Sequence, residues 1–553
     1  MSQMKGCSAG RGACAASRDA AVSSAKDEDA GAAMSGSQPT RTDEPTLPGD
    51  RSWVPGKPKT LGMLAGFEAR YANEGVNVFG SDMASSFTHA GKVVLLFGDT
   101  FKAKDSACDT SLGENDDMVG TLPLDYNGEL PLLDVVSGPS SPPRYRPVQM
   151  FDGEKSLLMD EFKVPIAGFS HGESAYALLQ AQIPLTCDAK AAEGEQGCPD
   201  QAGVSCVPDI SLCEPAPVST PTACEAGRPL CILGGCKRAA VCVDTRSSQF
   251  DGSPRGNAAS MLSTVFIGKA RGDDLATYDV VSRWKTNVFS HLSVRAVTRF
   301  SGETSGGDYT QGQGDLLIWG RPALHAEQGR EARLYFASVK LPLEEGGELQ
   351  PRYFTGSDAA SGEPTWTDDP AAAQALSMDG TPNGDNHERQ AVVSLTSVSW
   401  LPEPINQWVM MYGGDLPDVL LADASGTRST PNAGSIVMRF AKHPWGPWSP
   451  AIAHLPAGSP AVEGDAYGPG GILFHSACVD LPNARCARSD PYSLQLTGQC
   501  VMRPGPELGR LYAPAIVDAY TRKNERGGLN VVWAISTWMP YAAYLMETSI
   551  DPG

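Results

Sequence analysis

The 553-residue chain lacks the features of several large protein classes. No run approaches the roughly 20 consecutive apolar residues that a membrane-spanning helix requires. Basic residues are outnumbered, because 44 Lys and Arg stand against 64 Asp and Glu, and the net charge of −20 argues against a nucleic-acid partner. What remains is an acidic chain, 41 % hydrophobic, that is long enough to bury a large core.

Motifs typical of cofactor and metal enzymes are also missing. The sequence has no P-loop, no dinucleotide fingerprint that opens a helix, and no HExxH, GxSxG or EF-hand signature. Only eight His residues occur, which argues against a histidine-rich catalytic metal site. We therefore expect no cofactor and no catalytic metal, although a structural calcium ion is compatible with the sequence.

Turn-forming residues are abundant, since 59 Gly and 43 Pro occur without a collagen-like period. Apolar strand patterns recur at intervals of 82, 141, 92 and 122 residues, beginning at Lys92, Ser174, Asp315, Gln407 and Leu529. The longest interval contains a cysteine-rich window, without which it shortens to 85 residues. Five similar units predict an all-β fold, namely a five-bladed β-propeller over residues 56–553. A large sandwich or two β domains is the alternative.

Eight of the 14 cysteines fall within residues 187–242. This window has few large apolar residues, so covalent staples are needed to order it. We interpret it as a disulfide-rich insertion with four internal disulfides. A zinc cluster is the alternative, but the window has no His and no paired CxxC motif. Disulfides predict an oxidising compartment; a cytoplasmic scaffold with reduced cysteines is the competing interpretation.

The N-terminal residues, 1–55, are rich in Ala, Ser, Gly and Asp and are predicted to be a disordered tether. No signal peptide with an apolar h-region is visible. The Met-Lys-Gly-Cys7-Ser-Ala start nevertheless resembles the tether behind the acylated cysteine of a bacterial lipoprotein. We expect an exported, cell-envelope or extracellular monomer with Cys7 as the candidate lipid anchor, whose leader is removed or whose start is misassigned.

The most informative segment, residues 77–101, is typical of a β-hairpin that turns between His89 and Lys92. With a loop of two or four residues, Asp82 stands directly opposite Asp99, with Cβ atoms roughly 4.5–5.5 Å apart; a three-residue loop makes the pair diagonal. Like charges so placed destabilise a sheet, which suggests a function. Two such carboxylates suit glycoside hydrolysis, because mutual repulsion leaves one as acid and one as base. For either Asp alone, a turn hydrogen bond is the alternative.

Four further segments strengthen this interpretation: LLIWGRP, AKHPWGPWSP, GRLYAPAIVDAY and LNVVWAISTWMPYAAYLMETSI. Together with the hairpin they resemble a bacterial family of exported five-bladed β-propellers, formerly a domain of unknown function, that includes endo-D-arabinanases. The resemblance covers most of residues 60–550. It implies a furanosidase fold with a catalytic pair at Asp82 and Asp99. The sequence departs from the family at Gly-Ser-Asp82-Met, where members more often have Thr-Asp-Leu-Gly, and in the cysteine-rich insertion.

Six other residues are candidates for substrate binding, and three of them have a structural alternative. They are His171, Arg321, Glu388, His475, Trp538 and Tyr541. A structural role for His171, a surface ion pair for Arg321 and core packing for Trp538 are the alternatives. The run of Asn115, Asp116 and Asp117 would line the mouth of the site or form a solvated loop.

The sequence therefore predicts a glycoside hydrolase that cleaves a furanose-containing polysaccharide, endo-acting on D-arabinan, through Asp82 and Asp99. The expected separation favours a retaining route with Asp82 as nucleophile and Asp99 as acid/base; the swapped roles are the alternative. The competing hypothesis is a non-catalytic, surface-anchored propeller that binds carbohydrate or protein.

Overall fold

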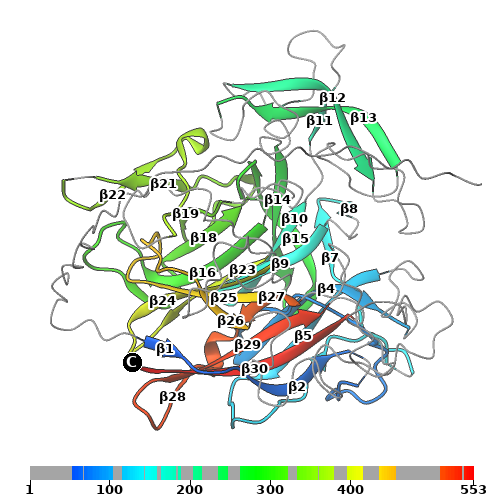
Figure 1. Cartoon of the computed structure of the whole chain (residues 1–553). Helices are drawn as coiled ribbons and strands as arrows, with labels where there is room; N and C mark the ends of the chain where they lie inside the picture. The colour runs from blue at the N-terminus through cyan, green and yellow to red at the C-terminus, as the bar shows by residue number, and fades with distance from the viewer. Residues whose placement is uncertain are drawn as a thin grey trace, which may run out of the picture. The chain divides into compact units, whose positions relative to one another are not determined.

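The computed structural model describes most of the chain beyond the predicted tether. The described residues are 53–66, 68–103, 115–141, 143–157, 163–181, 185–187, 198, 203–214, 235–246, 262–289, 291–321, 333–358, 360–378, 395–414, 435–455, 511–537 and 541–553. In these ranges helical structure is limited to two 3₁₀ turns, η3 (Pro370–Ala372) and η6 (Asp518–Tyr520) (Figure 1). The predicted all-β class is confirmed. None of the described helical segments has the length and apolar character needed to cross a membrane.

Five sheets of four or more strands follow one another along the chain. The first sheet contains β3 (Ser85–His89), β4 (Lys92–Phe101), β5 (Asn115–Pro123) and β6 (Asp134–Val135). The second contains β9 (Lys163–His171), β10 (Ser174–Ala181), β14 (Ser263–Arg271) and β15 (Asp274–Thr286), extended by β7 (Gln149–Asp152), β8 (Lys155–Leu157) and β20 (Gly347–Glu348).

The third and fourth sheets are antiparallel throughout. The third contains β16 (His291–Arg299), β17 (Asp308–Gln311), β18 (Asp315–Arg321), β19 (Tyr335–Lys340), β21 (Arg352–Ser357) and β22 (Pro364–Thr367). The fourth contains β23 (Thr396–Leu401), β24 (Gln407–Gly414), β25 (Ser435–Ala441) and β26 (Ile452–Leu455).

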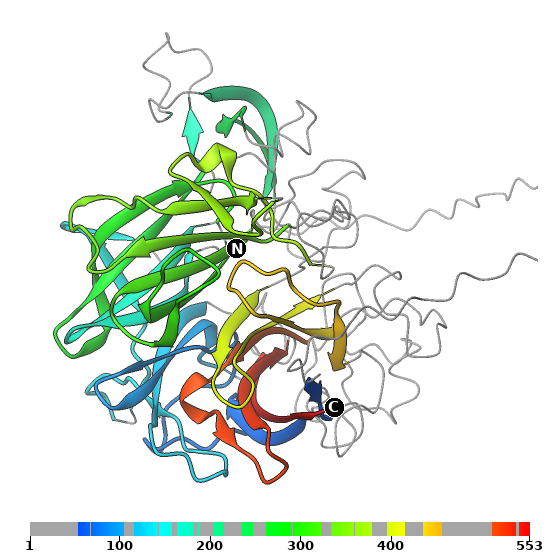
Figure 2. The same ribbon diagram turned by 90° about the vertical axis from the view of Figure 1, so that its left-hand side faces the viewer.

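The fifth sheet joins the two ends of the described chain. Its C-terminal strands are β27 (Leu511–Ile516), β28 (Arg522–Lys523), β29 (Leu529–Thr537) and β30 (Ala542–Pro552). Two N-terminal strands, β1 (Trp53–Pro55) and β2 (Lys59–Ala65), pair with β30, and β2 in blue lies beside β30 in red (Figure 2). Strand β1 thus lies inside the C-terminal boundary of the predicted 1–55 tether, whose residues 1–52 are outside the described ranges.

Apolar clusters fill the spaces between successive sheets, and a fifth cluster lies between the fifth sheet and the first. Strand β4 shows how alternation produces this packing. Val93 and Leu95 belong to the cluster shared with the fifth sheet, whereas Val94 and Leu96 belong to the cluster shared with the second. Because both faces of such a strand are buried, its sequence is a continuous apolar run instead of an alternating one.

Apart from the strands that extend the second sheet and the two N-terminal strands of the fifth, the first strands of the five sheets contact one another in a cycle. Strand β3 contacts β9, β9 contacts β16, β16 contacts β23, β23 contacts β27, and β27 contacts β3. A sandwich of two packed sheets has no such cycle, so the arrangement is propeller-like.

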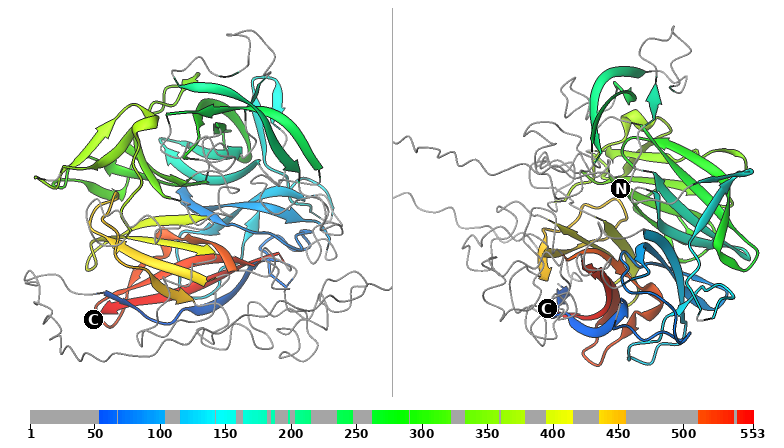
Figure 3. Two further views of the ribbon diagram at one scale, coloured as in Figure 1. Left: turned by 45° about the horizontal axis from the view of Figure 1, so that its top comes forward. Right: turned by 90° about the vertical axis from the view of Figure 1, so that its right-hand side faces the viewer.

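The cysteine-rich window forms a small sheet of its own. It consists of β11 (Thr186–Cys187), β12 (Val204–Glu214) and β13 (Gly235–Asp244), the last two being long antiparallel neighbours (Figures 1 and 3). Among the described residues of the window, two disulfides connect it, Cys187–Cys206 and Cys198–Cys242. They confirm the predicted disulfide framework for these four cysteines, which a zinc cluster would have needed as free thiolates.

Candidate active site

The hairpin of β3 and β4 has the predicted register. Its two-residue turn is Ala90 and Gly91, with left-handed φ angles of 46° and 73° that suit a tight hairpin. Beyond it, the bridges on either side of Asp82 keep the same register, in which the counterpart of Asp82 is Asp99. These bridges are Ser85–Leu96 and Gly80–Phe101.

Asp82 itself lies outside the strand, which differs from the continuous hairpin that the sequence predicts. Met83 and Ala84 adopt left-handed φ angles of 72° and 54°, so β3 starts only at Ser85. The backbone N–H groups of Ala84 and Gly98 both donate to the Asp82 carbonyl, at 3.0 and 3.1 Å. Such non-glycine conformations cost on the order of 1–3 kcal/mol each and cluster at functional sites. The backbone is thus strained next to the predicted catalytic carboxylate.

The Asp82 carboxyl packs directly on Gly98. A Cβ atom at position 98 would lie 2.5 Å from both Asp82 Oδ1 and Met83 Sδ, closer than real contacts allow. Because Gly98 has no side chain, it leaves the space that the Asp82 carboxyl occupies.

Gly98→Ala is expected to displace the Asp82 carboxyl and to lower any Asp82-dependent rate by about 10²-fold, the usual effect of a misplacement near 1 Å. Gly120→Ala is the matched control, since it overpacks the same sheet against Leu133. Steady-state rates and thermal stability of both variants check the prediction. Equal loss of activity in the two would attribute the effect to general overpacking.

A tyrosine hydroxyl reaches each of the two carboxylates. Tyr512 Oη, at the start of β27, donates to Asp82 Oδ2. Tyr541 Oη, just before β30, donates to Asp99 Oδ2 at 3.3 Å. Residues from the first and fifth sheets thus meet in one cluster, although Tyr512 is 430 positions from Asp82.

Burial and hydrogen bonding in the cluster have opposite effects on the ionisation of Asp82. Burial, with the side chain 5 % exposed, raises the pKa of Asp82 to about 7, and the Tyr512 hydroxyl opposes this by stabilising the carboxylate. The pKa of Tyr512 lies well above 10, first through burial and then through Asp82, Tyr541 and Asp99. Both carboxylates therefore act on Tyr512, and Asp82 holds its proton up to neutral pH.

A third carboxylate stands beside the pair. Asp117 on β5 is paired in register with Asp99 and is buried. Its neighbour Asp116 forms an ion pair with Lys102. Of the predicted acidic run, Asp117 therefore belongs to the interior of the site and Asp116 to its surface.

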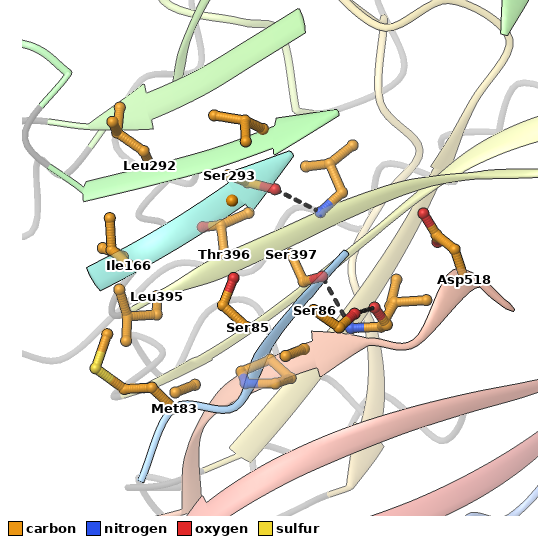
Figure 4. A pocket seen from close by; sticks show the side chains of 17 residues that line it. Met83, Ser85, Ser86, Ile166, Leu292, Ser293, Leu395, Thr396, Ser397 and Asp518 are labelled. Carbon is orange, nitrogen blue, oxygen red and sulfur yellow. Dashed lines mark hydrogen bonds between the residues drawn. The ribbon is translucent and has the colours of Figure 1, made fainter. Parts of the chain in front are cut away.

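A cavity of about 50 Å³ lies between the first strands of all five sheets (Figure 4). Serine hydroxyls cross-link these strands: Ser86 Oγ donates to the Ile516 carbonyl at 2.8 Å, and Ser397 Oγ accepts from the Ile516 N–H at 2.9 Å. At this volume the cavity accommodates one or two waters and no sugar ring. A saccharide would therefore have to reach Asp82 and Asp99 from outside this cavity.

The structure brings one of the six predicted binding residues to the pair. Tyr541 contacts Asp99, but its ring is 2 % exposed and packs edge-on against Phe101 at 4.9 Å, so it offers no face to a sugar. His171 ends β9 next to Ser170, whose hydroxyl contacts His89 at the turn of the first hairpin. The predicted position of His171 at the site is therefore wrong, because it lies at the opposite end of the strands from Asp82.

Arg321 ends β18 directly opposite His291, the first residue of β16, and is buried. It is not the surface ion-pair residue of the alternative interpretation. Three other candidates, Glu388, His475 and Trp538, lie outside the described residues.

Tyr512 is the residue that sequence reasoning missed. Its segment, GRLYAPAIVDAY, was recognised as similar to the family, but nothing in it marks one tyrosine as a partner of Asp82.

Within the described ranges, one set of potential metal ligands clusters closely. The Sγ atoms of Cys187, Cys198 and Cys206 lie within 4.8 Å of one another. All three are in disulfides, so they do not form a metal site.

No family model matches the chain, and no curated protein sequence matches it. Among solved structures, a protein from Bacteroides ovatus, provisionally described as a hydrolase, is 11 % identical over 86 % of each chain, with a TM-score of 0.36. The α-L-arabinofuranosidase of Podospora anserina is 10 % identical over 90 % of this chain and 97 % of its own, with a TM-score of 0.33. A β-fructofuranosidase of Microbacterium saccharophilum is 7 % identical over 90 % and 79 %, with a TM-score of 0.27. Similarity at this level assigns no function to this chain.

Proposed function

We propose that the protein is a glycoside hydrolase that cleaves a furanose-containing polysaccharide, endo-acting on D-arabinan. The observation that carries this proposal is the placement of Asp82, whose pKa is raised to about 7, opposite a second carboxylate, Asp99. Glycoside hydrolysis requires one carboxyl group that keeps its proton and one that is ionised. Burial provides the first of these groups at Asp82, and Asp99 is the candidate for the second.

The electrostatics favour the swapped assignment of roles. Asp82 is buried and retains its proton, so we assign it as the acid/base; Asp99 becomes the nucleophile. The hairpin register around the two residues supports a short carboxyl separation, as retaining enzymes have. We therefore expect the product to keep the anomeric configuration of the substrate.

Architecture and location are part of the same proposal. The cycle of first strands and the five inter-sheet clusters support a five-bladed propeller over residues 56–553, with 187–242 as an insertion. The disulfides of the insertion support export to an oxidising compartment, with Cys7 as the lipid anchor. An uncharged glycan substrate is compatible with the net charge of −20.

Incubation with arabinogalactan, lipoarabinomannan and defined α- and β-linked arabinofuranans tests the function. Wild-type protein should release oligosaccharides from D-arabinan, seen by size analysis and by new reducing ends, and NMR should show the retained anomer first. Asp99→Asn should lower the rate at least about 10³-fold. Unchanged cleavage by this variant would refute the assignment, and saccharide binding without cleavage by the wild type would favour the non-catalytic alternative.

A further inference from the structure

The carboxylates and their tyrosine partners come from opposite ends of the chain. Asp82 and Asp99 belong to the hairpin of the first sheet, whereas Tyr512 and Tyr541 belong to the fifth sheet. The site therefore exists only where these two sheets are packed together. We propose that Tyr512 is the positioning residue of this site, holding the Asp82 carboxyl in place from the neighbouring sheet. This inference rests on the proposed function.

The backbone around both partners is constrained for this contact. Ala513, next to Tyr512, has a left-handed φ of 51°, and Met83, next to Asp82, has one of 72°. The Met83 N–H donates to Ser536 Oγ of β29 at 2.8 Å, which ties the Asp82 turn to the fifth sheet a second time. Strained residues on both sides of one hydrogen bond indicate that the contact is held by the surrounding structure.

The titratable groups that face Asp82 come from several elements. In the described part of the chain, Tyr512 on β27 bonds to it, Tyr541 precedes β30, and Asp99 stands opposite on β4 with Asp117 beside it on β5. Asp99 and Asp117 are potential negative charges that favour a proton on Asp82. The Tyr512 hydroxyl is the neutral donor that favours the ionised form.

Loss of the hydroxyl should therefore shift the titration of Asp82 in a defined direction. Without its donor the carboxylate is less stable, so Asp82 should release its proton at higher pH. We expect the midpoint to rise by about one pH unit, a tenfold change in proton affinity. In the proposed reaction, the alkaline limb of kcat/KM should rise by the same amount, because the acid form persists to higher pH.

Infrared difference titration tests the inference without relying on activity. The carbonyl band of protonated Asp82 is identified as the band that is absent in Asp82→Asn. The intensity of this band is then measured as a function of pH in wild type and in Tyr512→Phe. Tyr520→Phe is the control, because this tyrosine also has a buried ring and donates to a backbone carbonyl, that of Pro123, at 2.6 Å. The band midpoint should rise in Tyr512→Phe and stay constant in Tyr520→Phe.

An unchanged midpoint in folded Tyr512→Phe would overturn the inference, whatever the activity. If wild-type protein cleaves no arabinan while the midpoint still rises, the positioning role stands and the proposed function fails. If Tyr512→Phe does not fold, protein made with fluorotyrosine, a stronger donor, must show a lower midpoint than unlabelled protein. A midpoint that does not fall would again contradict the inference.

Discussion

Asp82→Asn is expected to give a protein that is inactive and yet more stable than the wild type at pH 8. The folded state raises the pKa of Asp82 to about 7 from an unfolded value near 3.9, so folding favours the protonated form. The stabilisation is complete below pH ~3.9 and is lost as the pH rises through about 7. Above that, a buried carboxylate remains that costs on the order of 4 kcal/mol.

An Asn side chain removes this cost and keeps an oxygen that can accept from Tyr512. Urea unfolding of wild type and variant at pH 4 and pH 8 checks the prediction, and the gain should appear at pH 8 only. Asp116→Asn is the control, since Asp116 pairs with Lys102 at the surface of the same sheet. A variant that is less stable than wild type at pH 8 would show that Asp82 is not held as a strained, buried acid.

A gain in stability combined with a loss of activity would also support a functional origin for the burial. Residues selected for packing lose stability when they are replaced, whereas residues placed for chemistry often gain it. The left-handed backbone of Met83 and Ala84 beside Asp82 has the same character, because it costs free energy.

The sequence could predict the hairpin because its signals are local. A two-residue turn with Gly91 and apolar runs on both sides determine the register, and with it the opposition of Asp82 and Asp99. The break before Ser85 was not predictable, because Met83 and Ala84 have no glycine to mark a left-handed backbone. Tertiary contacts at Gly98 and Ser536 hold that conformation.

Contacts between residues from distant segments of the chain could not be predicted from local sequence signals. The contact of Tyr512 with Asp82 depends on how the last sheet packs on the first, which no local pattern encodes. The error on His171 has a related cause. The sequence does not show in which direction β9 runs, and in the structure His171 ends this strand at the turn side of the sheet.

His454 is expected to make the protein sensitive to acid. Its ring lies in the fourth sheet, buried against Trp533 of the fifth, and its Nε2 contacts Thr548 Oγ1 at 2.8 Å. Trp533 Nε1 donates to the same hydroxyl at 3.0 Å. The Thr548 hydroxyl can therefore donate its own proton to Nε2 of a neutral imidazole. Burial lowers the pKa of His454 to about 4. A proton on this ring would be buried without a carboxylate partner among the described residues.

The sign of the effect follows from the two pKa values. Above pH ~6.5 the ring is neutral in both states and stability is unaffected. As the pH falls from ~6.5 to about 4, the unfolded chain gains a proton that the folded chain does not. About 3 kcal/mol is lost over this window, and no more below it. Asp82 changes stability in the opposite direction over an overlapping range, so the wild-type profile shows only the difference between the two.

His454→Gln separates the two contributions. Glutamine keeps a neutral group that can bond to Thr548 but cannot take up the proton, so the variant should lose less stability than wild type between pH 6.5 and 4. Urea unfolding at half-unit steps of pH measures this slope. In the double variant, which combines His454→Gln with Asp82→Asn, the contributions of both residues to the pH dependence of stability should be absent. A wild-type slope in His454→Gln would place the acid-sensitive group elsewhere.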